Sequence, residues 1–139
     1  MKILVIDAQG GGIGRQLIAK LLERIPEADI VAAGTNSMAT NAMIKAGAKK
    51  AATGENAIRY CASQAEIITG PIGILVANAM LGEISPAIAE SVGSSTAPKV
   101  LIPTAHCNTI IAGTKALPVK DSIEDAVDRI VRIHGGEDN

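Results

Sequence analysis

An apolar strand that runs directly into a glycine loop and then a helix dominates the start of this chain. Residues 3–6 are Ile-Leu-Val-Ile, four of the five residues 10–14 are glycine, and residues 12–24 carry apolar side chains at helical spacing. In this order the three segments aim backbone N–H groups and the positive end of the helix dipole at one point. Phosphate is the usual ligand of such a point, so the sequence predicts an anion site here.

The remaining sequence repeats the alternation of strand and helix. Apolar runs predict strands at 29–33, 49–52, 66–69 and 99–102, with a further short strand at 109–112. Capping residues and helical spacing predict helices at 37–47, 55–62, 86–92 and 122–133, and residues 70–84 fit either a helix or a strand. We therefore predict a single α/β domain over residues 1–139 with a three-layer Rossmann-like fold, in which helices cover both faces of a mostly parallel sheet.

The amino-acid composition limits which binding partners and which cellular compartment are expected. Tyr60 is the only aromatic residue and the net charge is −1, so the stacking side chains and the basic excess of nucleic-acid-binding proteins are missing. No apolar run reaches the roughly 18 residues of a membrane-spanning helix. Two cysteines without a CxxC spacing predict a cytoplasmic protein with reduced thiols and no metal site. The low share of charged residues, 19%, indicates a homo-oligomer.

The glycine loop (residues 10–14) matches known loop patterns only in part. Aligned on Gly14, the dinucleotide-binding pattern GxGxxG has Gly11 at its second glycine but Gln9 at its first. A tight turn without a ligand is the alternative, although four glycines exceed what a turn requires. We predict that a phosphorylated ligand, in the first place a dinucleotide such as NAD or NADP, is held by Gly10, Gly11, Gly12, Ile13, Gly14 and Arg15.

Two further segments are expected at this site, because the carboxyl ends of parallel strands meet at one edge of a sheet. The strand at 29–33 lacks a following acid, which NAD enzymes use to hold ribose hydroxyls, and is followed by Thr35, Asn36 and Ser37. Their hydroxyl and amide groups suit a phosphate better than a ribose diol, with a helix N-cap as the alternative. The strand at 66–69 precedes a segment expected under the distal half of the ligand, with a ligand-free turn as the alternative: Gly70, Pro71, Ile72 and Gly73.

No set of residues identifies a reaction. His106 and Cys107 are adjacent on an extended segment and would point to opposite sides, so a Cys–His nucleophile pair is not expected. Asp7 and Glu55 remain as acid–base candidates, although Glu55 would equally stabilise the start of a helix. The sequence therefore favours binding over catalysis. It leaves open a non-catalytic nucleotide sensor, an oligomeric interaction protein, and an enzyme whose site a partner subunit completes.

Several blocks together resemble a family of short bacterial proteins catalogued only as a domain of unknown function. The blocks are residues 7–14, 34–36, 52–58, 70–73, 80–84, 93–95 and 107–108, so the resemblance runs over nearly the whole chain. It implies a compact Rossmann-like protein with a nucleotide site. It supplies no substrate and no catalytic residue.

Overall fold

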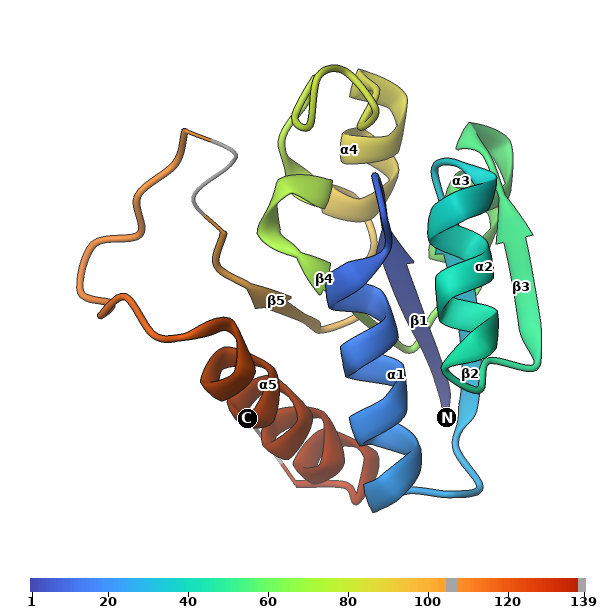
Figure 1. Cartoon of the computed structure of the whole chain (residues 1–139), viewed down its shortest axis with the longest axis vertical. Helices are drawn as coiled ribbons and strands as arrows, with labels where there is room; N and C mark the ends of the chain where they lie inside the picture. The colour runs from blue at the N-terminus through green and yellow to red at the C-terminus, as the bar shows by residue number, and fades with distance from the viewer. Residues whose placement is uncertain (105–107, 138–139) are drawn as a thin grey trace.

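The computed structural model describes residues 1–104 and 108–137. This part of the chain is built around a five-stranded parallel sheet in the order β3-β2-β1-β4-β5 (Figure 1). Its strands are β1 (Lys2–Asp7), β2 (Asp29–Gly34), β3 (Lys50–Thr53), β4 (Ile67–Pro71) and β5 (Lys99–Ile102). The central strands are continuous apolar runs, as strands covered on both faces require.

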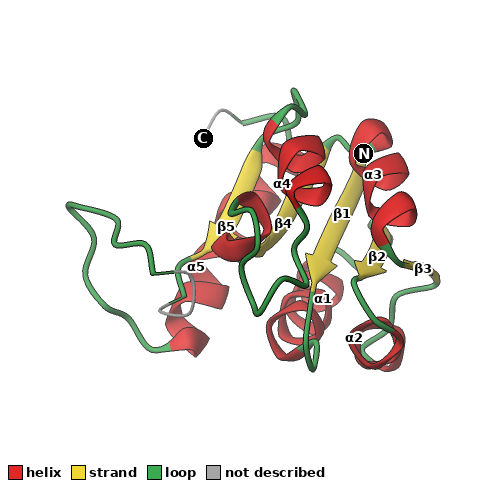
Figure 2. Ribbon diagram, turned by 90° about the horizontal axis from the view of Figure 1, so that it is seen from above, coloured by secondary structure: helices red, strands yellow, loops and turns green. Residues whose placement is uncertain are grey.

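Helices cover both faces of this sheet (Figure 2). On one face lie α1 (Gly12–Arg24), α2 (Ser37–Lys45) and α5 (Val119–His134), and on the other lie α3 (Glu55–Gln64) and α4 (Pro86–Gly93). Side chains of β1 alternate between the two layers: Ile3 and Val5 pack on the α1 side, and Leu4 and Ile6 on the α3 side. The predicted three-layer Rossmann-like architecture is confirmed.

The sheet topology places the chain reversal at β1. From β1 the chain moves outward to β2 and β3, and then crosses back to β4 on the opposite side of β1. Asp7 and Gly34 are register partners at the ends of β1 and β2, so the connections that follow these two strands leave the sheet side by side. Ligands of open α/β sheets bind at the carboxyl ends of the strands beside such a reversal.

Three expectations about elements are corrected. Residues 109–112 form no strand: Ile110 is 95% exposed, and the segment pairs with no described strand. The ambiguous range 70–84 is neither one helix nor one strand. β4 extends to Pro71, a 3-10 helix η1 (Ile72–Leu75) follows, and turns lead to α4. The last helix begins at Val119 rather than at residue 122.

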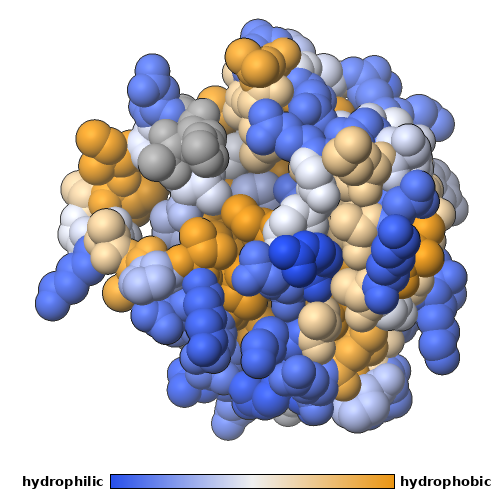
Figure 3. All heavy atoms as spheres, viewed as in Figure 1, coloured by the Kyte–Doolittle hydropathy of each residue, from blue (hydrophilic) through white to orange (hydrophobic). Residues whose placement is uncertain are grey.

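The β5–α5 segment (residues 108–118) stands away from the sheet at the left of Figure 1. Apolar side chains gather over it in the space-filling view of Figure 3. Ile110, Ile111 and Leu117 are 95%, 40% and 54% exposed. No helix in the described residues has the length and apolar character needed to cross a membrane.

Candidate functional site

A cavity of about 380 Å³ lies at the carboxyl ends of β1 and β4. It is lined by residues 7–13, Gln16, Pro71, Met80, Thr104 and Val119. Five of the sequence-predicted site residues are among them: Gly10, Gly11, Gly12, Ile13 and Pro71. The cavity therefore lies where the sheet topology favours a ligand.

Two glycines of the loop are required by the fold itself. Gly11 has a φ of 72° and caps α1, and a Cβ there would lie 2.8 Å from the Ala39 carbonyl oxygen of α2. A Cβ at Gly14 would lie 2.7 Å from Met43 Sδ and 3.0 Å from Asp7 Cβ. These two glycines let α1 pack closely on β1 and α2.

The other two glycines have no such reason within the described residues. A Cβ at Gly10 or Gly12 would meet nothing within 4 Å, and neither residue has a positive φ. We find no hydrogen-bond partner for their N–H groups among the described residues. Because Gly12 is the first residue of α1, its N–H belongs to the positive end of the helix dipole. Both glycines leave room for a ligand to approach the backbone closely.

Asp7 holds the glycine loop in place through hydrogen bonds to the backbone. Its side chain is 4% exposed, and its two carboxylate oxygens accept hydrogen bonds from the N–H of Ala8 (2.8 Å) and of Gly14 (2.6 Å). Burial raises the pKa of Asp7, and the charge of Glu83 adds to this, while N–H groups of the loop oppose it. Asp7 therefore occupies the Gly14 N–H, and it leaves the N–H groups of Gly10 and Gly12 without a partner among the described residues.

Glu83, to which the sequence analysis gave no role, reaches across to this loop from the η1–α4 segment (residues 76–85). Its Oε1 accepts hydrogen bonds from Gln9 N (2.9 Å), Thr35 Oγ1 (2.7 Å) and Asn36 Nδ2 (2.9 Å). Burial opposes the ionised form, but these hydrogen bonds outweigh it and lower the pKa of Glu83. The only sequence signal is that Glu83 is the single acid within residues 70–84.

The residues after β2 hold Glu83 and start α2. Asn36 is the N-cap of α2 and accepts from Ala39 N (2.9 Å), while its amide group donates to Glu83. The Thr35 hydroxyl donates a hydrogen bond to the same carboxylate. Ser37 is exposed in the first turn of α2. The N-cap alternative is therefore correct for Asn36, and the amide and hydroxyl donors are already engaged with a carboxylate.

The segment at the end of β4 contributes mainly through Pro71. Gly70 lies close to the backbone of β1, and a Cβ at Gly70 would collide with the Ile6 carbonyl oxygen. Ile72 and Gly73 belong to η1, and Gly73 is buried. Of the four residues predicted at this point, Pro71 alone lines the cavity.

Other candidates do not line this cavity, among them Thr35, Asn36 and Ser37, and two are outside the described residues. Arg15 lines a neighbouring cavity of about 370 Å³ between α1, α2 and α5. Glu55 is in the first turn of α3 and accepts a hydrogen bond from the Ser85 hydroxyl, consistent with a helix-end role. His106 and Cys107 lie outside the described residues.

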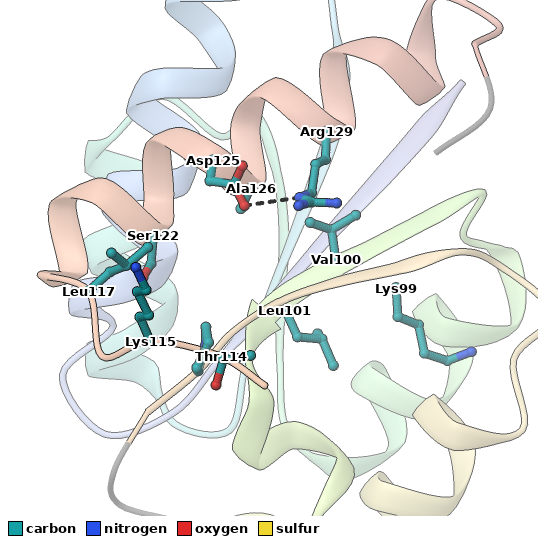
Figure 4. Close-up of a pocket in the computed structure, with 11 residues that line it drawn as sticks. Lys99, Val100, Leu101, Thr114, Lys115, Leu117, Ser122, Asp125, Ala126 and Arg129 are labelled. Carbon is teal, nitrogen blue, oxygen red and sulfur yellow. Dashed lines mark hydrogen bonds and ion pairs between the residues drawn. The ribbon is translucent and has the colours of Figure 1, made fainter. Parts of the chain in front are cut away.

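A larger cavity, of about 490 Å³, lies between β5, the β5–α5 segment and α5 (Figure 4). Its wall carries the Arg129–Asp125 ion pair (2.9 Å), which Figure 4 shows on α5, opposite Thr114 and Lys115. It holds none of the sequence-predicted site residues. Within the described part of the chain, no group of three or more His, Cys, Asp or Glu side chains is placed to hold a metal ion.

Comparison with known proteins identifies a family but no activity. A model described as a domain of unknown function (DUF3842) matches residues 2–135. No curated protein matches the sequence. Among solved structures, the chain is similar to a dodecameric FMN-dependent Ubix-like decarboxylase from Escherichia coli. The identity is 16%, the TM-score is 0.53, and 99% of this chain and 96% of that chain are covered.

A weaker likeness links the chain to two other structures. Apo saccharopine dehydrogenase from Saccharomyces cerevisiae gives a TM-score of 0.47 at 13% identity, over 90% of this chain and 24% of that one. AibC gives a TM-score of 0.47 at 14% identity, over 98% of this chain and 42% of that one. At such identities the comparisons show a shared fold alone.

Proposed function

The chain belongs to the DUF3842 family, and from that premise we propose that it binds a phosphorylated nucleotide cofactor, in the first place a dinucleotide such as NAD or NADP. The proposed site is the cavity at the carboxyl ends of β1 and β4. The similarity to an FMN-dependent enzyme is compatible with a nucleotide cofactor on this fold.

The observation that carries the proposal is the contrast within the glycine loop. Gly11 and Gly14 are explained by packing, whereas Gly10 and Gly12 face open space beside the cavity. A Cβ at Gly10 or Gly12 would collide with no other atom, so packing does not explain why these two residues are glycines. In this proposal they are glycines because a ligand approaches the backbone there. The proposed phosphate contacts are the N–H groups of Gly10 and Gly12 at the start of α1.

The hydrogen bond between Asp7 and Gly14 also limits how far a phosphate can enter beneath the glycine loop. Asp7 occupies the Gly14 N–H, so the diphosphate of a dinucleotide would rest on the outer side of the loop. Pro71 and Met80 line the cavity opposite the loop and offer apolar contact to the rest of the ligand. In this proposal Ile13 lines the cavity, and Arg15 acts from the neighbouring surface by its charge alone.

Thermal-shift measurements with NAD, NADP, FMN and ATP test the proposal. A ligand at 100 times its Kd stabilises the native state by about 2.7 kcal/mol. For a chain of this size that is a rise in Tm of roughly 8–10 °C. Absence of a shift with every one of these nucleotides at millimolar concentration would contradict the proposal.

Gly12→Asp is the sharpest variant. Its Cβ has open space, and an acid in the first turn suits the helix dipole, so the variant should fold with an unchanged or higher Tm. The new carboxylate would stand among the phosphate donors, so the nucleotide shift should disappear. Gln64→Glu adds the same charge at the far end of α3 and should keep the shift. Binding that survives in Gly12→Asp would show that the loop is only a turn.

A second candidate function, an oligomeric protein whose site is completed by a partner copy, is favoured by the β5–α5 segment. Its exposed apolar side chains lead directly into Val119, which is 46% exposed and lines the cavity. A second copy packed on this segment would therefore adjoin the nucleotide site. The dodecameric assembly of the similar decarboxylase is compatible with this candidate.

A further inference from the structure

Glu83 brings a carboxylate to the end of β2, the place where the sequence has no acid. Its Oε1 accepts from Thr35 Oγ1 (2.7 Å) and Asn36 Nδ2 (2.9 Å), and these two residues follow β2 directly. A third donor, Gln9 N (2.9 Å), belongs to the connection after β1. The carboxylate thus lies between the loops that follow β1 and β2, where dinucleotide-binding folds place the adenosine ribose.

The packing of β2 explains why this acid comes from another part of the chain. A Cβ at Gly34, the last residue of β2, would lie 2.8 Å from the backbone N of Thr40 and 3.0 Å from the Asn36 carbonyl oxygen. Any side chain at this position would collide with the start of α2. The last residue of β2 therefore cannot carry the acid, and Glu83 brings one from a neighbouring segment.

The Glu83 carboxylate retains capacity for a ligand. All three donors converge on Oε1, and we find no partner for Oε2 among the described residues. The backbone of Glu83 is held as well, because its N–H donates to the Met80 carbonyl (3.2 Å), and Met80 lines the cavity. The side chain is only partly buried, so a hydroxyl group of a ligand can approach the second oxygen.

The charges around this point are unfavourable for an additional phosphate. Asp7 and Glu83 both carry carboxylates here, and none of the described residues that line the cavity is Lys or Arg. Arg15 lines a different cavity. The donors of Thr35 and Asn36, which suit a phosphate by sequence, are held by Glu83.

We propose that Glu83 determines the specificity of the nucleotide site by accepting hydrogen bonds from an unesterified ribose diol and repelling a 2′-phosphate. The preferred ligands are adenosine nucleotides with a free diol, so NAD is bound in preference to NADP. Thr35, Asn36 and Gln9 position the carboxylate. This inference rests on the nucleotide-binding function proposed above.

Isothermal titration of NAD and NADP into the full chain tests it, with Glu83→Gln as the main variant. A glutamine keeps an acceptor oxygen for the three donors but removes the charge, so the fold should be retained. The wild type should bind NAD at least about tenfold more tightly than NADP, and Glu83→Gln should shrink this ratio about tenfold. Glu90→Gln, which removes an exposed acid from α4, should leave the ratio unchanged.

The possible outcomes separate this inference from the proposed function. Nucleotide binding with an equal or inverted NAD/NADP ratio in the wild type, or with the same ratio in Glu83→Gln, overturns the role of Glu83 and leaves nucleotide binding standing. Binding of FMN alone does the same, since FMN has no adenosine ribose. Absence of binding by every nucleotide overturns both. If Glu83→Gln does not fold, Glu83→Asp is the second variant, since it keeps the charge but shortens the side chain by one methylene. It should weaken NAD binding and lower the preference for NAD over NADP.

Discussion

Gly11 and Gly12 are neighbours with opposite requirements. Gly11 has a left-handed backbone and no room for a Cβ beside Ala39, whereas Gly12 has ordinary helical geometry and open space. We expect Gly11→Ala to lower the free energy of unfolding by about 2–4 kcal/mol, from the left-handed backbone and the collision together. Gly12→Ala should leave it unchanged or raise it by up to about 1 kcal/mol. Urea denaturation of the two variants checks this, and equal losses would contradict it.

The sequence predicts where the glycine loop is but treats its four glycines alike. What separates them is Ala39 and Met43 of α2, which are contributed by a later segment and meet the loop only after α2 has packed. The role of Glu83 is hidden for the same reason, since its hydrogen bond to Thr35 spans 48 positions. Local patterns report backbone preferences, and these roles depend on distant contacts.

The η1–α4 segment is the element that Glu83 ties to its neighbours. Asn78, Met80 and Leu81 all have positive φ values, which cost free energy in residues with side chains. The ends of the segment are joined by the Asn78 N–H to Ile84 carbonyl hydrogen bond (2.7 Å), and Ile84 is fully buried. Hydrogen bonds from the β1–α1 and β2–α2 connections to Glu83 then hold the segment over the loop.

Acidic pH should weaken the hydrogen bonds to the Glu83 carboxylate. Because the folded-state pKa of Glu83 is below its ordinary value of 4.5, the ionised carboxylate stabilises the fold above that pH. Its contribution is lost as the pH falls through the lowered folded-state pKa. The stability advantage of the wild type over Glu83→Gln should therefore be constant near neutrality and shrink below about pH 4.5 in urea denaturation. A constant difference down to about pH 3 would contradict this.

Asp7 does not mimic this effect. Burial raises its pKa, so its charge makes the fold less stable as the pH rises through its titration, the opposite sign. Because Asp7 is present in both proteins, comparing wild type with Glu83→Gln removes most of its contribution. The measured difference then reports on the Glu83 hydrogen bonds.

The elements that the sequence predicts well are those whose own residues decide them. β1 and α1 match the expected ranges because the apolar run and the helical spacing are both strong and local. Residues 109–112 have the apolar composition of a strand but pair with no strand in the described part of the chain. In the range 76–85, Gly82 and Asn78 are residue types that favour positive φ, but Met80 and Leu81 are not, so the local sequence indicates these turns only in part.

At the scale of the whole molecule, the exposed β5–α5 segment carries the prediction of self-association. Ile110→Asp should shift the chain toward the monomer in light scattering, because it places a charge among the exposed apolar residues of this segment. Leu81→Asp is the matched control, since Leu81 is 99% exposed but belongs to the η1–α4 segment. A wild type that stays monomeric at high concentration would refute the oligomer proposal.

The collision that Thr40 imposes at Gly34 has a consequence for how ligand preference can change in this fold. In many dinucleotide-binding proteins a single replacement at the end of the second strand exchanges a carboxylate for a phosphate-binding group. Here the last position of β2 is closed to every side chain, and the carboxylate comes instead from the η1–α4 segment, a connection outside the sheet. Surface connections accept substitutions and insertions with little loss of stability. Ligand preference in this chain can thus diverge without disturbing the sheet, and comparison of relatives at the β2 position alone would miss that divergence.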